Sequence, residues 1–311
     1  MQGIVTKSTG SWYVVRTEVG QYTPCRIRGK FRMEGIKSTN PVAVGDVVDF
    51  ELEPQKETGV INKIHPRKNY IIRKSVNLSK QTHIIAANID QAFLLITIAN
   101  PVTMTSFIER FIATAEAYSI PVILLFNKVD SYTEIQLQEL EQLKDIYEDI
   151  GYECIDISAV TGRNVGLVKE LMKDQVSLFS GHSGVGKSTL INLIEPTLNL
   201  KTTIVSVQSG QGQHTTTFAE MFELSFGGFI IDTPGIKGFG VVDFEKQEVS
   251  DYFPEIFHFK QYCKFNNCLH LEEPGCAVLE AVEQDEIAFS RYRSYVQLLE
   301  NDDNYRGINE F

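Results

Sequence analysis

Two patterns of apolar and polar positions follow one another along the chain. In residues 1 to about 66, short runs of alternating apolar and polar residues are separated by turns that contain glycine, as in PVAVGDVVDFELE. This alternation predicts strands with one buried face, and about five strands in this length favour a small barrel of the OB type. The pattern does not give the order in which the strands pair.

From about residue 88, wholly apolar runs alternate with segments of helical period. The runs DQAFLLITIA, PVILLFNKVD, YECIDIS, QVSLFSG and FIIDTPG predict buried strands, and TSFIERFIATAEAY, TEIQLQELEQLKDIYEDI, NVGLVKELMK and STLINLI predict helices. Such a series builds a parallel, doubly wound sheet that binds its ligands at the carboxyl ends of the strands.

The composition divides the chain into three expected domains: an OB-like domain at 1–66, an α/β domain at 67–242 and a helical, acidic domain at 243–311. We expect the basic stretch RKNYIIRKS, which follows Pro66, to be a linker. This organisation makes the protein a multidomain α/β protein.

Charge is distributed unevenly. Residues 1–82 contain 14 Lys and Arg and 7 Asp and Glu, a net charge of +7. Because the whole chain has a net charge of −11, residues 83–311 carry a net charge of −18. The basic part is either a solvated face or a surface that binds RNA. The first ten residues lack the apolar core of a signal peptide, and we expect a cytoplasmic protein.

A phosphate-binding loop is predicted between a strand and a helix. Gly181, Gly186, Lys187 and Ser188 match the pattern G-x-x-x-x-G-K-[ST]. Backbone N–H groups of such a loop bind phosphates, while the Lys reaches the β- and γ-phosphates and the Ser can bind Mg²⁺. The expected nucleotide contacts are Gly181, His182, Ser183, Gly184, Val185, Gly186, Lys187, Ser188 and Thr189.

The tetrapeptide Asn127-Lys128-Val129-Asp130 follows a predicted strand and has the residues to recognise guanine. The Asp130 carboxylate can accept hydrogen bonds from N1–H and the 2-amino group of guanine, whereas adenine would leave it unpaired. A mismatch of this kind discriminates by about 10⁴, so we expect GTP to be preferred over ATP. Ser158 and Ala159 begin SAVTG, which is either a second base-binding loop or a simple turn before a helix.

Downstream, Asp232 ends the strand of FIIDTPG, where it would hold Mg²⁺, and the N–H of Gly235 can meet a γ-phosphate. The polar segment before it offers Thr215 or Thr216 as a switch ligand of Mg²⁺. Ile236 stands where many GTPases have a water-orienting Gln, so hydrolysis should be slow in isolation. His214 is the candidate catalytic replacement, or else a surface residue or RNA contact.

Cys263, Cys268, His270 and Cys276 form the pattern C-x4-C-x-H-x5-C. Three thiolates and an imidazole complete a tetrahedral shell without an open position, so we expect one structural Zn²⁺.

Together these motifs resemble those of TRAFAC-type GTPases, with the base-binding motifs before the phosphate-binding ones. This order is a circular permutation, which is topologically inexpensive where the termini of a domain lie close together. With the OB-like and cysteine-rich domains, NKVD, GHSGVGKST, GQHTTT, DTPG and CKFNNCLHLEEPGC resemble the RsgA family of ribosome small-subunit-dependent GTPases over essentially the whole chain. The family usually has Arg at the position of Gln213, so the switch loop here has one positive charge fewer.

The resemblance implies a GTPase that acts late in maturation of the small (30S) ribosomal subunit. It also implies contact with 16S rRNA through the OB and zinc domains, and hydrolysis of GTP, with Mg²⁺, that the subunit stimulates. We expect a monomer that binds neither membrane nor DNA. One alternative is a GTP-gated RNA-binding switch with negligible catalysis. A phosphate-loop kinase or ATPase is another, which NKVD disfavours.

Overall fold

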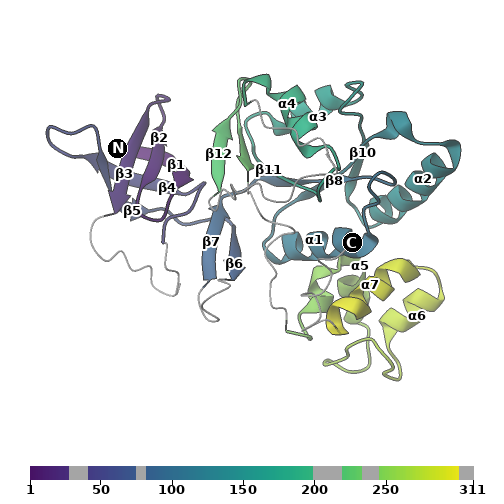
Figure 1. Cartoon of the computed structure of the whole chain (residues 1–311). Coiled ribbons are helices and arrows are strands. Elements are labelled where there is room, and N and C mark those ends of the chain that lie inside the picture. Colours follow the sequence, from purple (N-terminus) through teal and green to yellow (C-terminus); the bar gives the residue numbers. More distant parts are fainter. Residues whose placement is uncertain (28–40, 75–81, 199–218, 233–244, 301–311) are drawn as a thin grey trace, which may run out of the picture.

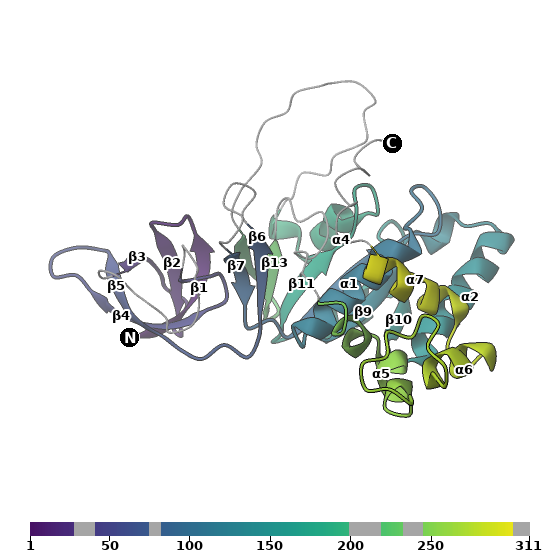
Figure 2. The ribbon, with the colours of Figure 1, turned by 90° about the horizontal axis from the view of Figure 1, so that it is seen from below.

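The computed structural model describes residues 1–27, 41–74, 82–198, 219–232 and 245–300, which fold into three parts (Figure 1). A barrel lies at one end, an α/β sheet with helices on both faces occupies the middle, and a helical C-terminal module lies against helix α1 (Figures 1 and 2). None of the helices in these ranges combines the length and the apolar character that a membrane span requires.

The barrel consists of β1 (Gln2–Ser8), β2 (Tyr13–Thr17), β3 (Tyr22–Ile27), β4 (Val47–Leu52) and β5 (Gly59–Ile64). They pair in the order β1-β2-β3-β5-β4, and β4 closes the barrel by pairing with β1. Only β3 and β5 are parallel. Alternate residues such as Val5, Val15, Phe50 and Ile61 are fully buried in a common core, as the alternation requires. The expected OB-like barrel is confirmed.

The central sheet has the strand order β10-β9-β8-β11-β13-β12. All neighbouring strands are parallel except the last pair. Its strands are β8 (Gln91–Ile96), β9 (Val122–Phe126), β10 (Glu153–Asp156), β11 (Val176–Ser180), β12 (Glu220–Glu223) and β13 (Phe229–Asp232). Its helices are α1 (Thr105–Ala117), α2 (Glu134–Asp149), α3 (Val165–Met172) and α4 (Lys187–Ile194), with short 3₁₀ turns η1 (Val129–Ser131) and η2 (Pro196–Leu198).

The two faces of this sheet carry separate cores. Side chains of α1 and α2, such as Phe111 and Leu140, pack with one face, and side chains of α3 and α4, such as Val168 and Ile191, pack with the other. Because both faces are covered, β8 and β9 are buried at every position, and apart from Gln91 at the start of β8 all their residues are apolar. The doubly wound architecture predicted from the apolar runs is therefore present.

Two features differ from the sequence-based expectation. The segment expected to be a linker contains β6 (Tyr70–Lys74), which forms an antiparallel hairpin with β7 (Thr82–Ala87) between the barrel and the central sheet. The sheet is also not wholly parallel, because β12 pairs antiparallel with β13. β6 and β12 are short, and each pairs with the next strand along the chain in a hairpin. Neither strand therefore has the long apolar run that marks a central strand.

β12 also connects the sheet to the barrel. It forms one antiparallel pairing with β1, at Lys7 and Glu220. The Lys7 ammonium lies 3.1 Å from the Glu220 carboxylate, and Arg16 forms a two-pronged ion pair with Glu223. The Tyr22 hydroxyl donates a hydrogen bond of 3.0 Å to Glu223. Barrel and sheet are thus joined by a continuous but narrow contact.

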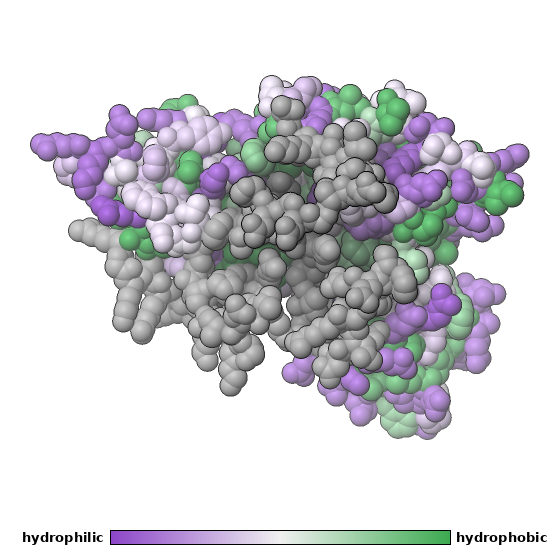
Figure 3. Space-filling model, in the orientation of Figure 1, coloured by the Kyte–Doolittle hydropathy of each residue, from purple (hydrophilic) through white to green (hydrophobic). Residues whose placement is uncertain are grey.

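The C-terminal module comprises η3 (Val249–Tyr252), α5 (Pro254–Lys260), α6 (Ala277–Glu283) and α7 (Phe289–Glu300), as the helical pattern after Asp243 predicted. Its core includes Phe253, Ile256 and Tyr295, together with Ala113 from α1. Figure 3 shows that hydrophobic side chains gather on this module, whereas the barrel face in the same view is mainly hydrophilic.

Candidate nucleotide site and metal cluster

The predicted nucleotide-binding segments follow strands that run in the same direction. Asn127 follows β9, Ser158 lies just after β10, Gly181 follows β11, and Asp232 is the last residue of β13. Because these strands are parallel, their carboxyl ends meet at one edge of the sheet. Motifs that lie far apart in the sequence are therefore neighbours in the fold.

The side chain of Asn127 connects three of these segments directly. Its amide Nδ2 donates a hydrogen bond of 2.7 Å to the carbonyl oxygen of Val185 in the phosphate loop. Its Oδ1 accepts a hydrogen bond of 3.0 Å from the N–H of Ala159. Asn127 is only 1% exposed, so these bonds satisfy a buried amide and fix the relative positions of the three loops.

The next residue strengthens this connection. Lys128 adopts a left-handed conformation, with φ of 71°, and its ammonium donates a hydrogen bond of 2.7 Å to the carbonyl oxygen of Gly184. It also donates to the carbonyl oxygen of Asn100. Partial burial lowers the pKa of Lys128, although Asp130 opposes this shift. Val129 is buried, while the Asp130 side chain is exposed and accessible to a base.

The phosphate loop has the backbone that its glycines predict. Gly181, Gly184 and Gly186 all have positive φ, and Gly186 immediately precedes α4. A Cβ atom on Gly186 would lie 2.4 Å from Asn127 Nδ2, so this position requires glycine for both conformation and space. Lys187 and Ser188 form the first turn of α4, where N–H groups without helical partners favour an anion.

The loop after β10 contains the simple turn that was one of the two alternatives for SAVTG. The Ser158 hydroxyl oxygen accepts a hydrogen bond of 3.0 Å from the N–H of Thr161, which is a local serine turn. The adjacent Ala159 N–H is donated to Asn127. The turn is thus tied through its backbone to Asn127, the first residue of NKVD.

Several predicted residues lie outside the described ranges. They are His214, Thr215, Thr216 and Gly235, together with Gln213 and Ile236. For Asp232 the backbone position at the end of β13 is described. A segment that the sequence analysis did not single out, the loop between β8 and α1, contacts the phosphate loop through Thr103 and His182, at 2.8 Å between Oγ1 and Nε2. The sequence signal that could have identified this loop is its position directly after the apolar strand β8, at the edge where the phosphate loop also lies.

The four predicted zinc ligands come together in the C-terminal module. The ligand atoms of Cys263, Cys268, His270 and Cys276 all lie within 4.8 Å of one another. His270 directs Nδ1 toward the sulfur atoms, at 3.5 Å from Cys263 Sγ and 3.4 Å from Cys276 Sγ. This donor set and its closeness fit one tetrahedral Zn²⁺ bound through Nδ1. Cys25 and Cys154 lie outside the cluster.

The loops of this cluster are fixed by the rest of the module. Tyr292 and Tyr295 of α7 donate hydrogen bonds of 2.8 and 2.9 Å to the carbonyl oxygens of His270 and Leu269. The Glu273 carboxylate accepts backbone N–H bonds from Leu269 and Leu271. Each partner restrains the chain on either side of the imidazole, which is the support that a structural metal site needs.

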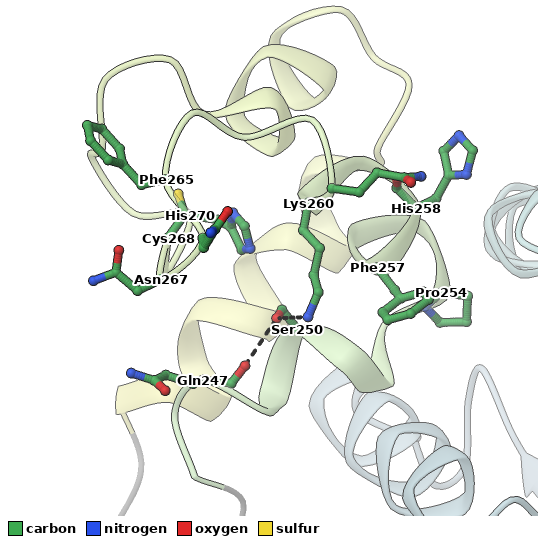
Figure 4. A pocket seen from close by; sticks show the side chains of 12 residues that line it. Gln247, Ser250, Pro254, Phe257, His258, Lys260, Phe265, Asn267, Cys268 and His270 are labelled. Atoms are coloured by element: carbon green, nitrogen blue, oxygen red, sulfur yellow. Dashed lines mark hydrogen bonds between the residues drawn. The ribbon is translucent and has the colours of Figure 1, made fainter.

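A pocket of about 590 Å³ lies beside this cluster and away from the phosphate loop. Figure 4 shows Cys268 and His270 at one side of it and Phe257, His258 and Lys260 at another, with Lys260 directed toward Ser250. Lys260 donates a hydrogen bond of 3.2 Å to the Ser250 hydroxyl. Aromatic, basic and amide side chains border the pocket, and none of its lining residues belongs to the phosphate loop or to NKVD.

Comparison with known proteins gives concordant results. The family model described as RsgA GTPase matches residues 64–242, and that of the RsgA N-terminal domain matches residues 2–61. The chain is 64% identical to a protein of Christiangramia forsetii, covering 98% of each chain. It is 62% identical to a protein of Flavobacterium psychrophilum, covering 97% of this chain and 94% of the relative. Both relatives are named small ribosomal subunit biogenesis GTPase RsgA.

Two solved structures share the whole fold. YjeQ from Thermotoga maritima superimposes with a TM-score of 0.75 at 35% identity, covering 96% of this chain and 97% of that one. YloQ, described as a circularly permuted GTPase, has a TM-score of 0.74 at 30% identity and covers 96% and 93% of the two chains. The permuted order of motifs, the fold and the matches over nearly the full length agree, and the chain belongs to the RsgA GTPase family.

Proposed function

We propose that this protein is a GTPase that binds the small ribosomal subunit and acts in its late maturation in the cytoplasm, with the subunit stimulating hydrolysis. The observation that carries the proposal is the pair of hydrogen bonds from Asn127 to Val185 and Ala159. They bring the base-reading and phosphate-binding segments to one edge of the sheet, where a single nucleotide can contact both. The relatives' names supply the ribosomal partner.

In this site, Asn127, Lys128, Val129 and Asp130 bind the base, and Ser158 and Ala159 border it. Gly181 to Thr189 surround the phosphates, with Lys187 neutralising the β- and γ-phosphates. Ser188 and Asp232, with Thr215 or Thr216, would hold Mg²⁺, which offsets negative charge on the phosphates when bound. Gly235 contacts the γ-phosphate, and His214 is the candidate group that orients the attacking water.

The proposed division of labour follows the domains 1–66, 67–242 and 243–311. The first and third contact 16S rRNA, and the middle one hydrolyses GTP as part of a monomer. Exposed aromatic side chains support RNA contact: Trp12 and Tyr22 on the barrel, and Phe257, Tyr262 and Phe265 on the C-terminal module. Arg26 lies 5.9 Å from the Trp12 ring centroid, and a neighbouring cation and aromatic ring can bind phosphate and stack on a base.

The test is nucleotide binding and turnover with and without purified small ribosomal subunits. We expect turnover to rise with the subunit, and Lys187→Ala to abolish it by removing phosphate neutralisation. Asp130→Asn should weaken GTP binding and favour xanthosine triphosphate, because an amide can donate to the carbonyl oxygen at C2 of xanthine. Unchanged nucleotide preference in Asp130→Asn would contradict the assigned base site.

The same measurements address the second candidate, a GTP-gated RNA-binding switch with negligible catalysis. The hydrophobic Ile236, where many GTPases have a water-orienting Gln, favours it for the isolated protein. GTP-dependent binding to the subunit without any stimulated turnover would support this switch and contradict the enzymatic proposal.

A further inference from the structure

The loop between β8 and α1, residues 97–104, lies beside the phosphate loop. It follows the carboxyl end of β8, and β8 pairs in parallel with β11, the strand that leads into Gly181. Thr97 is fully buried and Thr103 is 5% exposed. Their buried hydroxyl groups need partners, and those partners define the conformation of the loop.

A chain of hydrogen bonds runs from this loop to the phosphate loop. Thr103 Oγ1 accepts the N–H of Thr97 at 3.0 Å and lies 2.8 Å from His182 Nε2. The Thr97 hydroxyl donates to the carbonyl oxygen of Pro101 at 2.5 Å. The Thr103 hydroxyl proton can be donated to His182 Nε2, at 2.8 Å, or to Thr97 Oγ1, at 3.5 Å, and Nε2 is the nearer acceptor.

These contacts fit one neutral tautomer of the imidazole. The Ser183 carbonyl oxygen, 3.3 Å from Nδ1, can only accept, so in that tautomer Nδ1 carries the proton and Nε2 accepts from Thr103. A neutral ring satisfies both contacts. Burial lowers the pKa of His182, the nearby Lys128 ammonium lowers it further, and the Ser183 carbonyl opposes these effects. The imidazole thus receives one hydrogen bond from the neighbouring loop and donates one within its own loop.

Other contacts support the same face of the phosphate loop. The Phe107 ring of α1 meets the His182 ring edge-on, with 5.7 Å between their centroids. Lys128 donates to the carbonyl oxygens of both Asn100 and Gly184, so one ammonium ties the two loops together. The phosphate loop is therefore held by the guanine-reading segment on one side and by the β8–α1 loop on the other.

We propose that Thr103 is a positioning residue for nucleotide binding, which acts by holding His182 and thereby the phosphate loop in its binding conformation. The inference rests on the proposed function, because it assumes that Gly181 to Thr189 bind the phosphates. Thr103 makes its contact from outside the loop, so its effect on GTP passes through His182. A preformed loop binds more tightly because less conformational freedom is lost on binding.

The test uses Thr103→Val, which replaces the hydroxyl by a methyl group of similar size. We expect the Kd for a fluorescent GDP analogue to rise about tenfold, the scale of one lost buried hydrogen bond. Thr103→Ser keeps the hydroxyl and should bind like the unmodified protein. Thr114→Val is the matched control, because the buried Thr114 hydroxyl on α1 donates to the carbonyl oxygen of Arg110, at 2.7 Å.

Combination with His182→Ala separates positioning from a general loss of stability. If Thr103 acts through His182, adding Thr103→Val to His182→Ala should weaken GDP binding no further. An equal loss in both backgrounds, or normal binding by Thr103→Val, would overturn the inference. Failure of the unmodified protein to bind GDP would instead reject the proposed nucleotide site.

Discussion

At the scale of single residues, Asn127 shows how the site is assembled before a nucleotide arrives. Its amide uses one donor and one acceptor to join the loops after β9, β10 and β11. An alanine here would leave the Ala159 N–H and the Val185 carbonyl oxygen without these partners. A buried polar group without a partner costs about 1–3 kcal/mol, so Asn127 stabilises the geometry that the nucleotide requires.

Gly186→Ala should damage the site more than Gly184→Ala. Both glycines have positive φ, 98° and 86°, so each substitution strains the backbone. The Cβ on residue 186 would also lie 2.4 Å from Asn127 Nδ2, whereas the Cβ on residue 184 would meet Pro101 at 3.4 Å. We expect the Kd for GDP to rise about tenfold for Gly184→Ala and at least about 100-fold for Gly186→Ala.

Titration with a fluorescent GDP analogue measures both changes, and the heat-induced unfolding of the free proteins provides the control. Equal Kd values for the two variants would show that the contact with Asn127 is unimportant for binding.

At the scale of elements, α1 connects the nucleotide site with the C-terminal module. Phe107 in its first turn contacts His182, and Glu109, two residues further along the helix, pairs with Arg291 of α7. Arg291 is 1% exposed and also forms two hydrogen bonds, of 2.7 and 2.9 Å, with Glu255 of α5. Tyr147 of α2 donates a hydrogen bond of 2.8 Å to Glu109. Three helices from two parts of the chain thus converge on one guanidinium.

Arg291→Met should destabilise this junction. Methionine retains much of the side-chain volume but leaves Glu109 and Glu255 buried without their cation, which costs about 3–5 kcal/mol. The measurement is urea-induced unfolding followed by circular dichroism. Arg293→Met is the matched control, because Arg293 lies on the same helix and is exposed. Loss of stability by both variants to the same extent would contradict a specific role of the buried cluster.

At the scale of the whole molecule, the C-terminal module has its own core and its own cluster of candidate metal ligands. The apolar residues of that core come from η3, α5, α6 and α7, with Ala113 of α1 at the boundary. The phosphate loop meets α1 at its first turn, through Phe107 and His182, whereas the core of the module meets α1 at Ala113. Metal loss should therefore disrupt the module more than the nucleotide site.

We expect one Zn²⁺ per chain, and its loss in Cys268→Ser, because the cluster would keep only three of its four ligands. Cys154→Ser should retain the metal, since Cys154 lies outside the cluster. Metal content is measured by elemental analysis and helix content by circular dichroism. We expect Cys268→Ser to lose helix content while its Kd for GDP changes less than about threefold. Full metal content in Cys268→Ser would contradict the assigned ligand set.

Much of the fold was predictable because its signals are local. The apolar runs specified β8 and β9, and the helical periods specified α1 and α2, since burial on both faces or on one stripe leaves a direct pattern. The hairpin of β6 and β7 was missed because its basic residues suggested a linker. The roles of Asn100 and Thr103 were missed because their contacts, with Lys128 and His182, join residues 28 and 79 positions apart, and Asn100 contributes only its backbone carbonyl oxygen.

The amino-acid sequence by itself predicted most of the elements, the phosphate-loop and NKVD motifs, and the four Cys and His residues that the structure brings together. These features depend on residue types at short spacings, which can be read within one segment of the sequence. Only the tertiary structure decided the strand order of the barrel, the narrow joint between β1 and β12, and the convergence of Glu109, Glu255 and Arg291. Such contacts arise between distant segments, whose pairing depends on packing of the whole chain and leaves no repeating pattern in any one of them.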